Sequence, residues 1–330
     1  HLAGLTVIPI AVETNPTRFK LIVNTVNPLC VIGFEERNIE YPSLSLKEFE
    51  QLERIDSSNF NEFPPLNNIA DILFTTGTTG VPKGVQLTHA NISAAARNIN
   101  QFIGNAVDDI ELLSLPASHS FGLGRIRCCL TKGATLILLG SFVNVKRIFK
   151  IIEKENVTGF TMVPASWNYL RKMSGNQLSQ YANQIKYIEM GSAYFSSDEK
   201  RELSSLFPNT RVTMHYGLTE ASRSAFMEFH EDEACLDSVG KASPNTDIQI
   251  FDEQGNILPF YTDGEICVKG EHVTKGYLNT LNDKTFFGEY FRTGDWGYKN
   301  EKGYIYLKSR IKELINVGGM KVSPVEVEEI

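Results

Sequence analysis

The sequence predicts an α/β protein that combines two helix-covered, mostly parallel sheets with a smaller antiparallel, β-barrel-like subdomain. The first observation is that short apolar runs alternate with amphipathic segments over residues 1–223, as they do when helices connect the strands of a parallel sheet. The second is that residues 224–310 show short apolar runs separated by Gly and Asn turns, with little helical pattern. The third is size, because 330 residues with 42% hydrophobic content are enough for more than one domain.

Individual elements follow from these patterns. The strands expected in the α/β part are 5–12, 30–34, 70–74, 84–89, 110–116, 134–140, 157–164, 185–190 and 211–215. The helices expected there include 16–27, 143–156, 165–173 and 196–207. Two helix starts are marked by capping residues, Thr88 for the helix after residue 89 and Ser196 with Glu199 for the last one. The strands expected in the β-rich part are 224–230, 246–256, 264–270 and 303–310.

The same patterns predict three units along the chain. Residues 1–223 are expected to form α/β subdomains, residues 224–310 a β-rich subdomain, and residues 311–330 a hinge and the start of a small C-terminal domain. The chain begins in mid-pattern and stops where a helix is expected to start. We therefore expect a fragment of a larger protein with both ends truncated.

Composition and charge exclude several classes of protein. The net charge is −7, and the basic residues form no stripe interleaved with aromatic residues, so nucleic acid is not an expected partner. The five cysteines contain no C-x-x-C pair, which predicts neither a zinc site nor a disulfide framework and favours a cytoplasmic protein with reduced thiols. No apolar run approaches the ~20 residues of a membrane span.

The stretch TTGTTGVPKG, residues 75–84, has the chemistry of a phosphate-binding loop. Its glycines allow backbone N–H groups to turn toward an anion, its threonines add hydroxyl donors, and its lysine adds a positive charge. It is not a Walker loop, because Gly84 follows Lys83 where a magnesium-binding hydroxyl would be required. A plain hairpin turn is the alternative. The candidate phosphate-binding residues are Thr75, Thr76, Gly77, Thr78, Thr79, Gly80 and Lys83.

This loop resembles the signature [ST]-[ST]-G-[ST]-[ST]-G-x-P-K-G of the adenylate-forming superfamily of AMP-binding enzymes. That superfamily includes acyl- and aryl-CoA synthetases, firefly luciferase and the adenylation domains of peptide synthetases. The resemblance implies that the chain corresponds to the large N-terminal domain of such an enzyme. Further motifs in the same order along the chain support it.

The stretch HYGLTEAS, residues 215–222, resembles the Y-G-x-T-E motif of this superfamily. The resemblance implies that Tyr216 packs on adenine, that Thr219 contacts the α-phosphate and that Glu220 holds Mg²⁺, with His215 and Gly217 beside the nucleotide. A carboxylate suits this task, because a hard cation is needed to spread the charge of the leaving pyrophosphate. A turn with a solvated glutamate is the alternative reading.

Three more stretches match the superfamily. Residues 290–297, YFRTGDWG, resemble the Y-x-T-G-D motif, which implies that Asp295 accepts the ribose hydroxyls. Residues 308–330 resemble the inter-domain segment, which implies ribose contact by Arg310, a hinge at Lys312 and a pantetheine-lining loop at residues 318–319. Residues 264–279 are interpreted as mainly structural. The loop that passes beside adenine in the superfamily is matched by Gly191, Ser192 and Ala193, followed by Tyr194 where proline is usual.

The stretch PASHSFGLG, residues 116–124, bears on the acid substrate, because it resembles a segment of acyl- and aryl-CoA synthetases. The resemblance places His119 between the acid and the thiol tunnel, and the predicted acid pocket comprises His119, Ser120 and Tyr194. Amino-acid-activating domains carry aspartate at the position of Ser120, because a buried ammonium needs a paired charge. A simple carboxylic acid is therefore favoured over an amino acid.

The implied reaction activates a carboxylic acid with ATP and Mg²⁺, and then transfers the acyl group to a thiol of CoA or of the phosphopantetheine on an acyl carrier protein. The predicted catalytic residues are Lys83, His119, Thr219 and Glu220. Their task is positioning and charge stabilisation, since no covalent nucleophile is needed. Two alternatives stay open: an amino-acid adenylation domain, and a non-catalytic nucleotide-binding relative.

Overall fold

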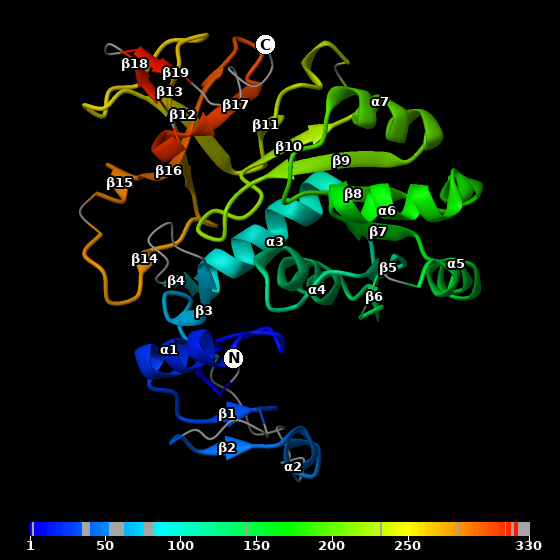
Figure 1. Ribbon diagram of the computed structural model, residues 1–330, viewed down its shortest axis with the longest axis vertical. Helices are drawn as coiled ribbons and strands as arrows, with labels where there is room; N and C mark the ends of the chain where they lie inside the picture. Colours follow the sequence, from blue (N-terminus) through cyan, green and yellow to red (C-terminus); the bar gives the residue numbers. More distant parts are fainter. Residues whose placement is uncertain are drawn as a thin grey trace.

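The structure is a computed structural model of the 330-residue chain, shown in Figure 1. It describes residues 1, 3–34, 40–52, 63–75, 82–140, 142, 144–231, 233–282, 284–313, 315–317 and 320–322. The large sheet and its helices lie on the right of the view, and the β-rich part lies at the upper left. The N-terminal elements lie at the bottom.

The largest sheet has seven strands in the order β11-β10-β9-β8-β7-β5-β6. Strands β5 to β9 are parallel, and β10 and β11 extend this sheet in antiparallel fashion beyond β9. Its strands are β5 (Ile110–Leu113), β6 (Thr135–Leu138), β7 (Gly159–Met162), β8 (Tyr187–Met190), β9 (Arg211–Tyr216), β10 (Ala225–Glu228) and β11 (Lys241–Ala242). The predicted α/β class is confirmed by this helix-connected parallel sheet.

Helices cover both faces of this sheet. On one face, the core is built from α5, α6 and α7 together with apolar side chains of the parallel strands, such as Phe160 and Ile188. On the other face, α3 and α4 pack against Tyr187 and Phe226. The helices are α3 (His89–Ile103), α4 (Ser120–Lys132), α5 (Val145–Lys154), α6 (Pro164–Ser174), α7 (Ser197–Leu206), and the short η1 (Gln177–Tyr181) and η2 (Glu233–Cys235).

Both predicted helix caps are confirmed. The Thr88 side chain caps α3 by accepting a hydrogen bond from the backbone N–H of Asn91. In return, the Asn91 side chain accepts one from the backbone N–H of Thr88. Ser196 and Glu199 form a reciprocal capping box at the start of α7. These bonds satisfy N–H groups that a helix start would otherwise leave without partners.

The second sheet differs from the prediction of a mostly parallel arrangement. Strands β3 (Ile69–Thr75), β4 (Lys83–Thr88) and β14 (Gly276–Tyr277) form an antiparallel sheet in the order β14-β4-β3. The reason is the connection between β3 and β4, which spans only residues 76–82 and is too short for the crossover that a parallel pair requires. Parallel pairing near it is limited, within the described residues, to the Val7–Asp71 bridge and to the β1–β2 pair.

The N-terminal elements complete this region. They are α1 (Pro16–Val26), β1 (Val31–Ile32), β2 (Ser43–Leu44) and α2 (Leu46–Glu50). Phe19 and Val23 of α1 pack against Val31 in a small core of their own. No helix in the described part of the chain is both long and apolar enough to span a bilayer.

The β-rich part is antiparallel, as predicted. Strands β12, β13, β16 and β15 pair in that order, and β17 also pairs with β16. Their bounds are β12 (Thr246–Phe251), β13 (Gly264–Gly270), β15 (Phe286–Phe287), β16 (Tyr290–Lys299) and β17 (Ile305–Arg310), followed by η3 (Ile311–Glu313), β18 (Ile315–Val317) and β19 (Met320–Val322). The domain boundaries at residues 223 and 310 stay a prediction.

Candidate nucleotide site

Tyr216, Asp295 and Arg310 come together although they lie far apart in the sequence. Tyr216 ends β9, where the carboxyl edge of the parallel sheet faces the β-rich part. Its hydroxyl donates a hydrogen bond to Oδ2 of Asp295 at 2.5 Å, and Nε of Arg310 lies 2.9 Å from Oδ1 of the same carboxylate. Strand pairing explains the second contact, because Asp295 of β16 is directly opposite Arg310 of β17.

Burial and the charge of Arg310 have opposite effects on the pKa of Asp295. Burial raises the pKa of Asp295, and the positive charge of Arg310 works against that increase. The Tyr216 pKa is raised well above its usual value by burial and by the neighbouring carboxylate, so its hydroxyl stays a donor. Asp295 is 2% exposed, whereas the Arg310 side chain is 46% exposed. One side of the cluster is therefore accessible from solvent.

Glu220 and Lys83 are linked through Tyr277, a residue that the sequence analysis placed in a structural segment. The Tyr277 hydroxyl donates to Oε1 of Glu220 at 2.7 Å, and Nζ of Lys83 lies 5.1 Å from the centre of the Tyr277 ring. Strand β14 brings Tyr277 here by pairing with β4, which begins at Lys83. Sequence analysis assigned Tyr277 to a structural motif but to no role at the site, because the pairing of β14 with β4 joins segments about 190 residues apart.

The two groups of residues share one region. The charge of Glu220 contributes to the pKa of Asp295, and the charge of Arg310 contributes to that of Tyr277, so these side chains lie within electrostatic range. Thr75 is paired with Lys83 across the β3–β4 hairpin, which places the mouth of the predicted phosphate loop beside them. The loop residues Thr76, Gly77, Thr78, Thr79 and Gly80 lie outside the described residues, as does the 318–319 pair.

The Gly191 loop packs directly against His215. A Cβ atom on Gly191 would lie 2.1 Å from the His215 ring, so only glycine fits there. Ser192 follows with a φ of 71°, a left-handed conformation that is uncommon for a residue with a side chain. Ser192 and Ala193 are exposed beside the end of β8. Gly217 is equally constrained, since a Cβ there would meet the backbone of Arg223 at 2.4 Å.

The residues predicted for the acid pocket are spread over two elements. His119 is exposed immediately before α4, Ser120 is the first residue of α4, and Tyr194 is 82% exposed in the Gly191 loop. Lys312 lies on η3, two residues after Arg310. The acid-pocket and hinge roles of these residues stay predictions.

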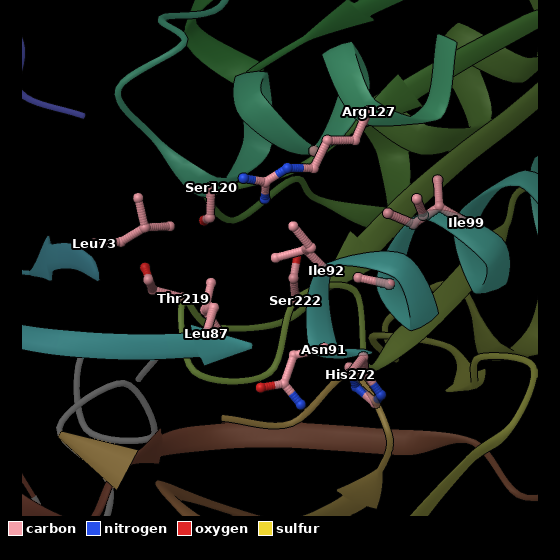
Figure 2. A pocket seen from close by; sticks show the side chains of 13 residues that line it. Leu73, Leu87, Asn91, Ile92, Ile99, Ser120, Arg127, Thr219, Ser222 and His272 are labelled. Atoms are coloured by element: carbon pink, nitrogen blue, oxygen red, sulfur yellow. The ribbon is translucent and has the colours of Figure 1, made fainter. Parts of the chain in front are cut away.

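A small cavity lies between α3, α4 and the turn that carries Thr219. Figure 2 shows Ser120, Thr219, Ser222 and Arg127 around this cavity, interspersed with the apolar side chains of Leu73, Leu87, Ile92 and Ile99. Ser120 is the one predicted acid-pocket residue that lines it. The guanidinium of Arg127 is already paired with the buried carboxylate of Asp71.

His272, which also lines this cavity, makes the stability of the protein depend on pH. It is 2% exposed, Nε2 contacts the Ser224 hydroxyl at 3.2 Å, and burial lowers its pKa from 6.5 to about 4. Because the folded state resists protonation of this imidazole, stability is lost as pH falls below the unfolded pKa. The shift corresponds to about 2 kcal/mol between pH 7 and pH 5. We expect urea unfolding to show this loss, and His272→Asn to reduce the fall; equal pH dependence in both proteins would contradict it.

A buried charge network supports the 215–223 turn, and sequence analysis did not identify it. Glu189 on β8 is fully buried, with Nδ1 of His215 2.7 Å and Nε of Arg223 3.1 Å from Oε1. Nη1 of Arg125 lies 3.4 Å from Oε2, and Arg125 also pairs with Glu111. Burial would raise the pKa of Glu189, but the surrounding positive charge, above all that of Arg223, holds it well below its usual value.

Arg223 also binds the start of α4. Its guanidinium donates to the carbonyl oxygens of Ser120 at 3.1 Å and Phe121 at 2.9 Å. It lies over the Phe121 ring at 4.7 Å, and the Phe121 ring meets the His215 ring edge-on. Arg223 has a φ of 54°, so a strained backbone is held in place by these contacts. The turn that carries Thr219 and Glu220 is thereby tied to both β8 and α4.

The donor set at Glu220 fits Mg²⁺. Within the described residues, no group of three or more His, Cys, Asp and Glu side chains is placed to form a metal site by itself. Mg²⁺ in nucleotide sites takes only one or two carboxylates and completes its shell with phosphate oxygens and water. A single glutamate carboxylate matches that requirement better than it matches a structural metal.

The fold and the motifs define an α/β nucleotide-binding class, and comparison with known proteins identifies the family. The model of the AMP-binding enzyme family matches residues 1–278, so the chain belongs to the AMP-binding enzymes, as the motif resemblance predicted.

The protein is similar to "4-coumarate--CoA ligase-like 9" of Arabidopsis thaliana, with 34% identity over 84% of this chain and 51% of that protein. It is also similar to "Acyl-CoA synthetase 7" of Caenorhabditis elegans, with 30% identity over 81% of this chain and 51% of that protein. The chain spans about half the length of the curated relatives that it matches.

Solved structures show the same fold. ATP-bound MatB from Rhodopseudomonas palustris matches with a TM-score of 0.88 and 24% identity, over 99% of this chain and 68% of that one. The o-succinylbenzoate CoA synthetase (MenE) of Bacillus subtilis, in complex with its acyl-adenylate intermediate, matches with a TM-score of 0.88 and 25% identity, over 99% and 67%. The superfamily fold predicted from the motifs is confirmed.

Proposed function

We propose that the protein activates a carboxylic acid with ATP, forming an acyl-adenylate and pyrophosphate, and transfers the acyl group to the thiol of CoA. The observation that carries this proposal is the convergence of Tyr216, Asp295 and Arg310 beside Glu220 and Lys83. These five residues come from four segments of an AMP-binding fold, and together they offer an aromatic ring, a ribose acceptor, a carboxylate and two cations.

The nucleotide end of the site is assigned by chemistry. The Asp295 carboxylate accepts the two ribose hydroxyls, and Arg310 holds that carboxylate from its open side. Tyr216 presents its ring to the purine while its hydroxyl fixes Asp295. The Gly191 loop offers the backbone of Ser192 and Ala193, which are exposed beside the end of β8, to one side of the base.

The reacting end is assigned to Lys83, Thr219 and Glu220. Lys83 and the Thr219 hydroxyl stabilise charge on the phosphates, and the Glu220 carboxylate holds the cation. When bound, Mg²⁺ would neutralise part of the negative charge on the leaving pyrophosphate. The carboxylate oxygen of the acid attacks the α-phosphorus, and the bond from that phosphorus to the pyrophosphate oxygen breaks. The thiol then attacks the acyl carbon, and AMP leaves.

The acid is proposed to approach from the start of α4, past His119 and Ser120. Ser120 offers no charge to pair with an α-ammonium, which favours a simple acid over an amino acid. CoA is favoured over a carrier-protein phosphopantetheine as the acceptor, because similar proteins bear the names of CoA ligases. The cytoplasm is the proposed compartment, and both ATP and CoA are available there.

Pyrophosphate exchange tests the proposal. The protein, with ATP and Mg²⁺, is screened against fatty, aryl and dicarboxylic acids and against amino acids. Exchange stimulated by a carboxylic acid and not by amino acids is expected. Stimulation by amino acids alone would favour a peptide-synthetase type of adenylation domain. Absence of both exchange and ATP binding in isothermal titration would favour a non-catalytic relative.

A further inference from the structure

Tyr277 occupies a position between the two most important charges of the reacting end. Its hydroxyl donates to Oε1 of Glu220, and its ring receives the ammonium of Lys83 on a face. Tyr277 is opposite Val85 in the β14–β4 pair, and Lys83 is two residues from Val85 on the same strand. Side chains two residues apart on a strand point to one face, so the ring and the ammonium meet by strand register.

The segment around Tyr277 fixes Glu220 at two points. The backbone N–H of Thr274 donates to the carbonyl oxygen of Glu220 at 2.8 Å, and the Tyr277 hydroxyl holds its carboxylate at 2.7 Å. The first bond sets the main chain and the second sets the rotation of the side chain. On the described residues, this second bond engages Oε1 and leaves Oε2 as the oxygen without a hydrogen-bond partner.

The phenol is suited to stay a donor. A tyrosine hydroxyl carries a proton that it can donate, and here it is directed at the Glu220 carboxylate. A tyrosine that only filled space would need neither the hydroxyl contact nor a cation on its ring. Here both functional faces of the side chain are used, each by a charge assigned to the phosphate chemistry.

The second effect of Tyr277 is to keep the Lys83 ammonium apart from the Glu220 carboxylate. An ammonium and a carboxylate that come close together near a protein surface attract each other and tend to form an ion pair. With the ring in place, Lys83 lies against the aromatic face and Glu220 at the phenol oxygen. A smaller side chain would allow them to pair directly and to neutralise each other before the nucleotide and the cation arrive.

We propose that Tyr277 is a positioning residue that orients the Glu220 carboxylate for a divalent cation and keeps Lys83 available for phosphate. The inference rests on the proposed function, in which the Glu220 carboxylate binds the cation. It adds that the Tyr277 hydroxyl orients this carboxylate. Partners of this kind commonly change metal affinity by about 10–100-fold when they are removed.

The test measures nucleotide binding by isothermal titration, without acid or thiol. ATP affinity is measured across a series of Mg²⁺ concentrations, and AMP affinity is measured without Mg²⁺. Tyr277→Phe retains the ring and removes the hydroxyl, and we expect it to raise the Mg²⁺ concentration needed for half-maximal ATP affinity by about 10-fold. AMP affinity should stay within about twofold of the wild type. Tyr277→Leu, which also removes the ring from Lys83, should show a larger shift.

Tyr290→Phe is the matched control. Tyr290 has the same arrangement, with its hydroxyl on Asp247 and the ammonium of Lys269 5.8 Å from its ring, but it lies on the β-rich part and outside the proposed machinery. Its Mg²⁺ dependence should equal that of the wild type.

Two results would overturn the inference while the proposed function stands. One is a Tyr277→Phe protein whose Mg²⁺ dependence equals that of the control. The other is a parallel loss of AMP and ATP affinity, which indicates a purely structural tyrosine. A wild-type protein whose ATP binding does not depend on Mg²⁺ would overturn both the inference and the proposed role of Glu220.

Discussion

Replacement of Arg223 by methionine is expected to lower the free energy of unfolding by about 3–5 kcal/mol, which is the usual cost of breaking a buried ion pair from one side. Glu189 is fully buried, and Arg223 is the strongest of the charges that keep it ionised. The substitution also removes two donors from the carbonyl oxygens at the start of α4. Urea unfolding of the two proteins measures the difference.

The double variant Arg223→Met/Glu189→Met separates charge from packing. If the cost of the single change comes from the stranded carboxylate, removing that carboxylate as well should restore most of the stability, because an apolar pair of similar volume is often neutral. Arg125 keeps its pairing with Glu111 in this variant. A loss below about 1 kcal/mol in the single variant, or no recovery in the double variant, would contradict the role of the network.

Asp295→Ala is expected to weaken ATP and AMP binding alike, by about 10–100-fold, since each nucleotide loses the hydrogen bonds of its ribose to a charged acceptor. Asp295 is the shared partner of Tyr216 and Arg310, so its loss also releases both of them. Isothermal titration with each nucleotide gives the two affinities.

Two further variants make this result specific. Asp247→Ala removes a carboxylate that also accepts from a tyrosine hydroxyl, Tyr290, but lies outside the site, and it should leave both affinities unchanged. Glu220→Gln should spare AMP, which carries no pyrophosphate, and weaken ATP binding in the presence of Mg²⁺. Unchanged AMP affinity in Asp295→Ala, or an equal loss in Glu220→Gln, would contradict the assignments.

The motifs in this sequence predict which residues form the site, and the structure brings several of them together, although their roles stay predictions. Asp295 and Arg310 were predicted to lie at the ribose, and the structure puts them in direct contact through the β16–β17 pairing. Thr88, Ser196 and Glu199 could be predicted as caps because capping chemistry acts within four residues of the chain.

Features that depend on distant pairing could not be predicted in the same way. The contact between Tyr277 and Glu220 requires knowledge that β14 pairs with β4, and a two-residue strand carries no periodicity to reveal that. The Glu189–Arg223 pair lies between a strand and a turn, and each residue alone resembles an ordinary surface charge. The expected parallel pairing of the second sheet is wrong because the connection between β3 and β4 is too short for the crossover that parallel strands require.

The central claim is that separate turns, carried by different strands, form one binding site for an adenine nucleotide. A crystal structure of the protein with AMP tests it most directly. The account predicts the purine against Tyr216 and both ribose hydroxyls on the carboxylate of Asp295, with Arg310 beside them. AMP bound elsewhere, with no contact to Asp295, would contradict it.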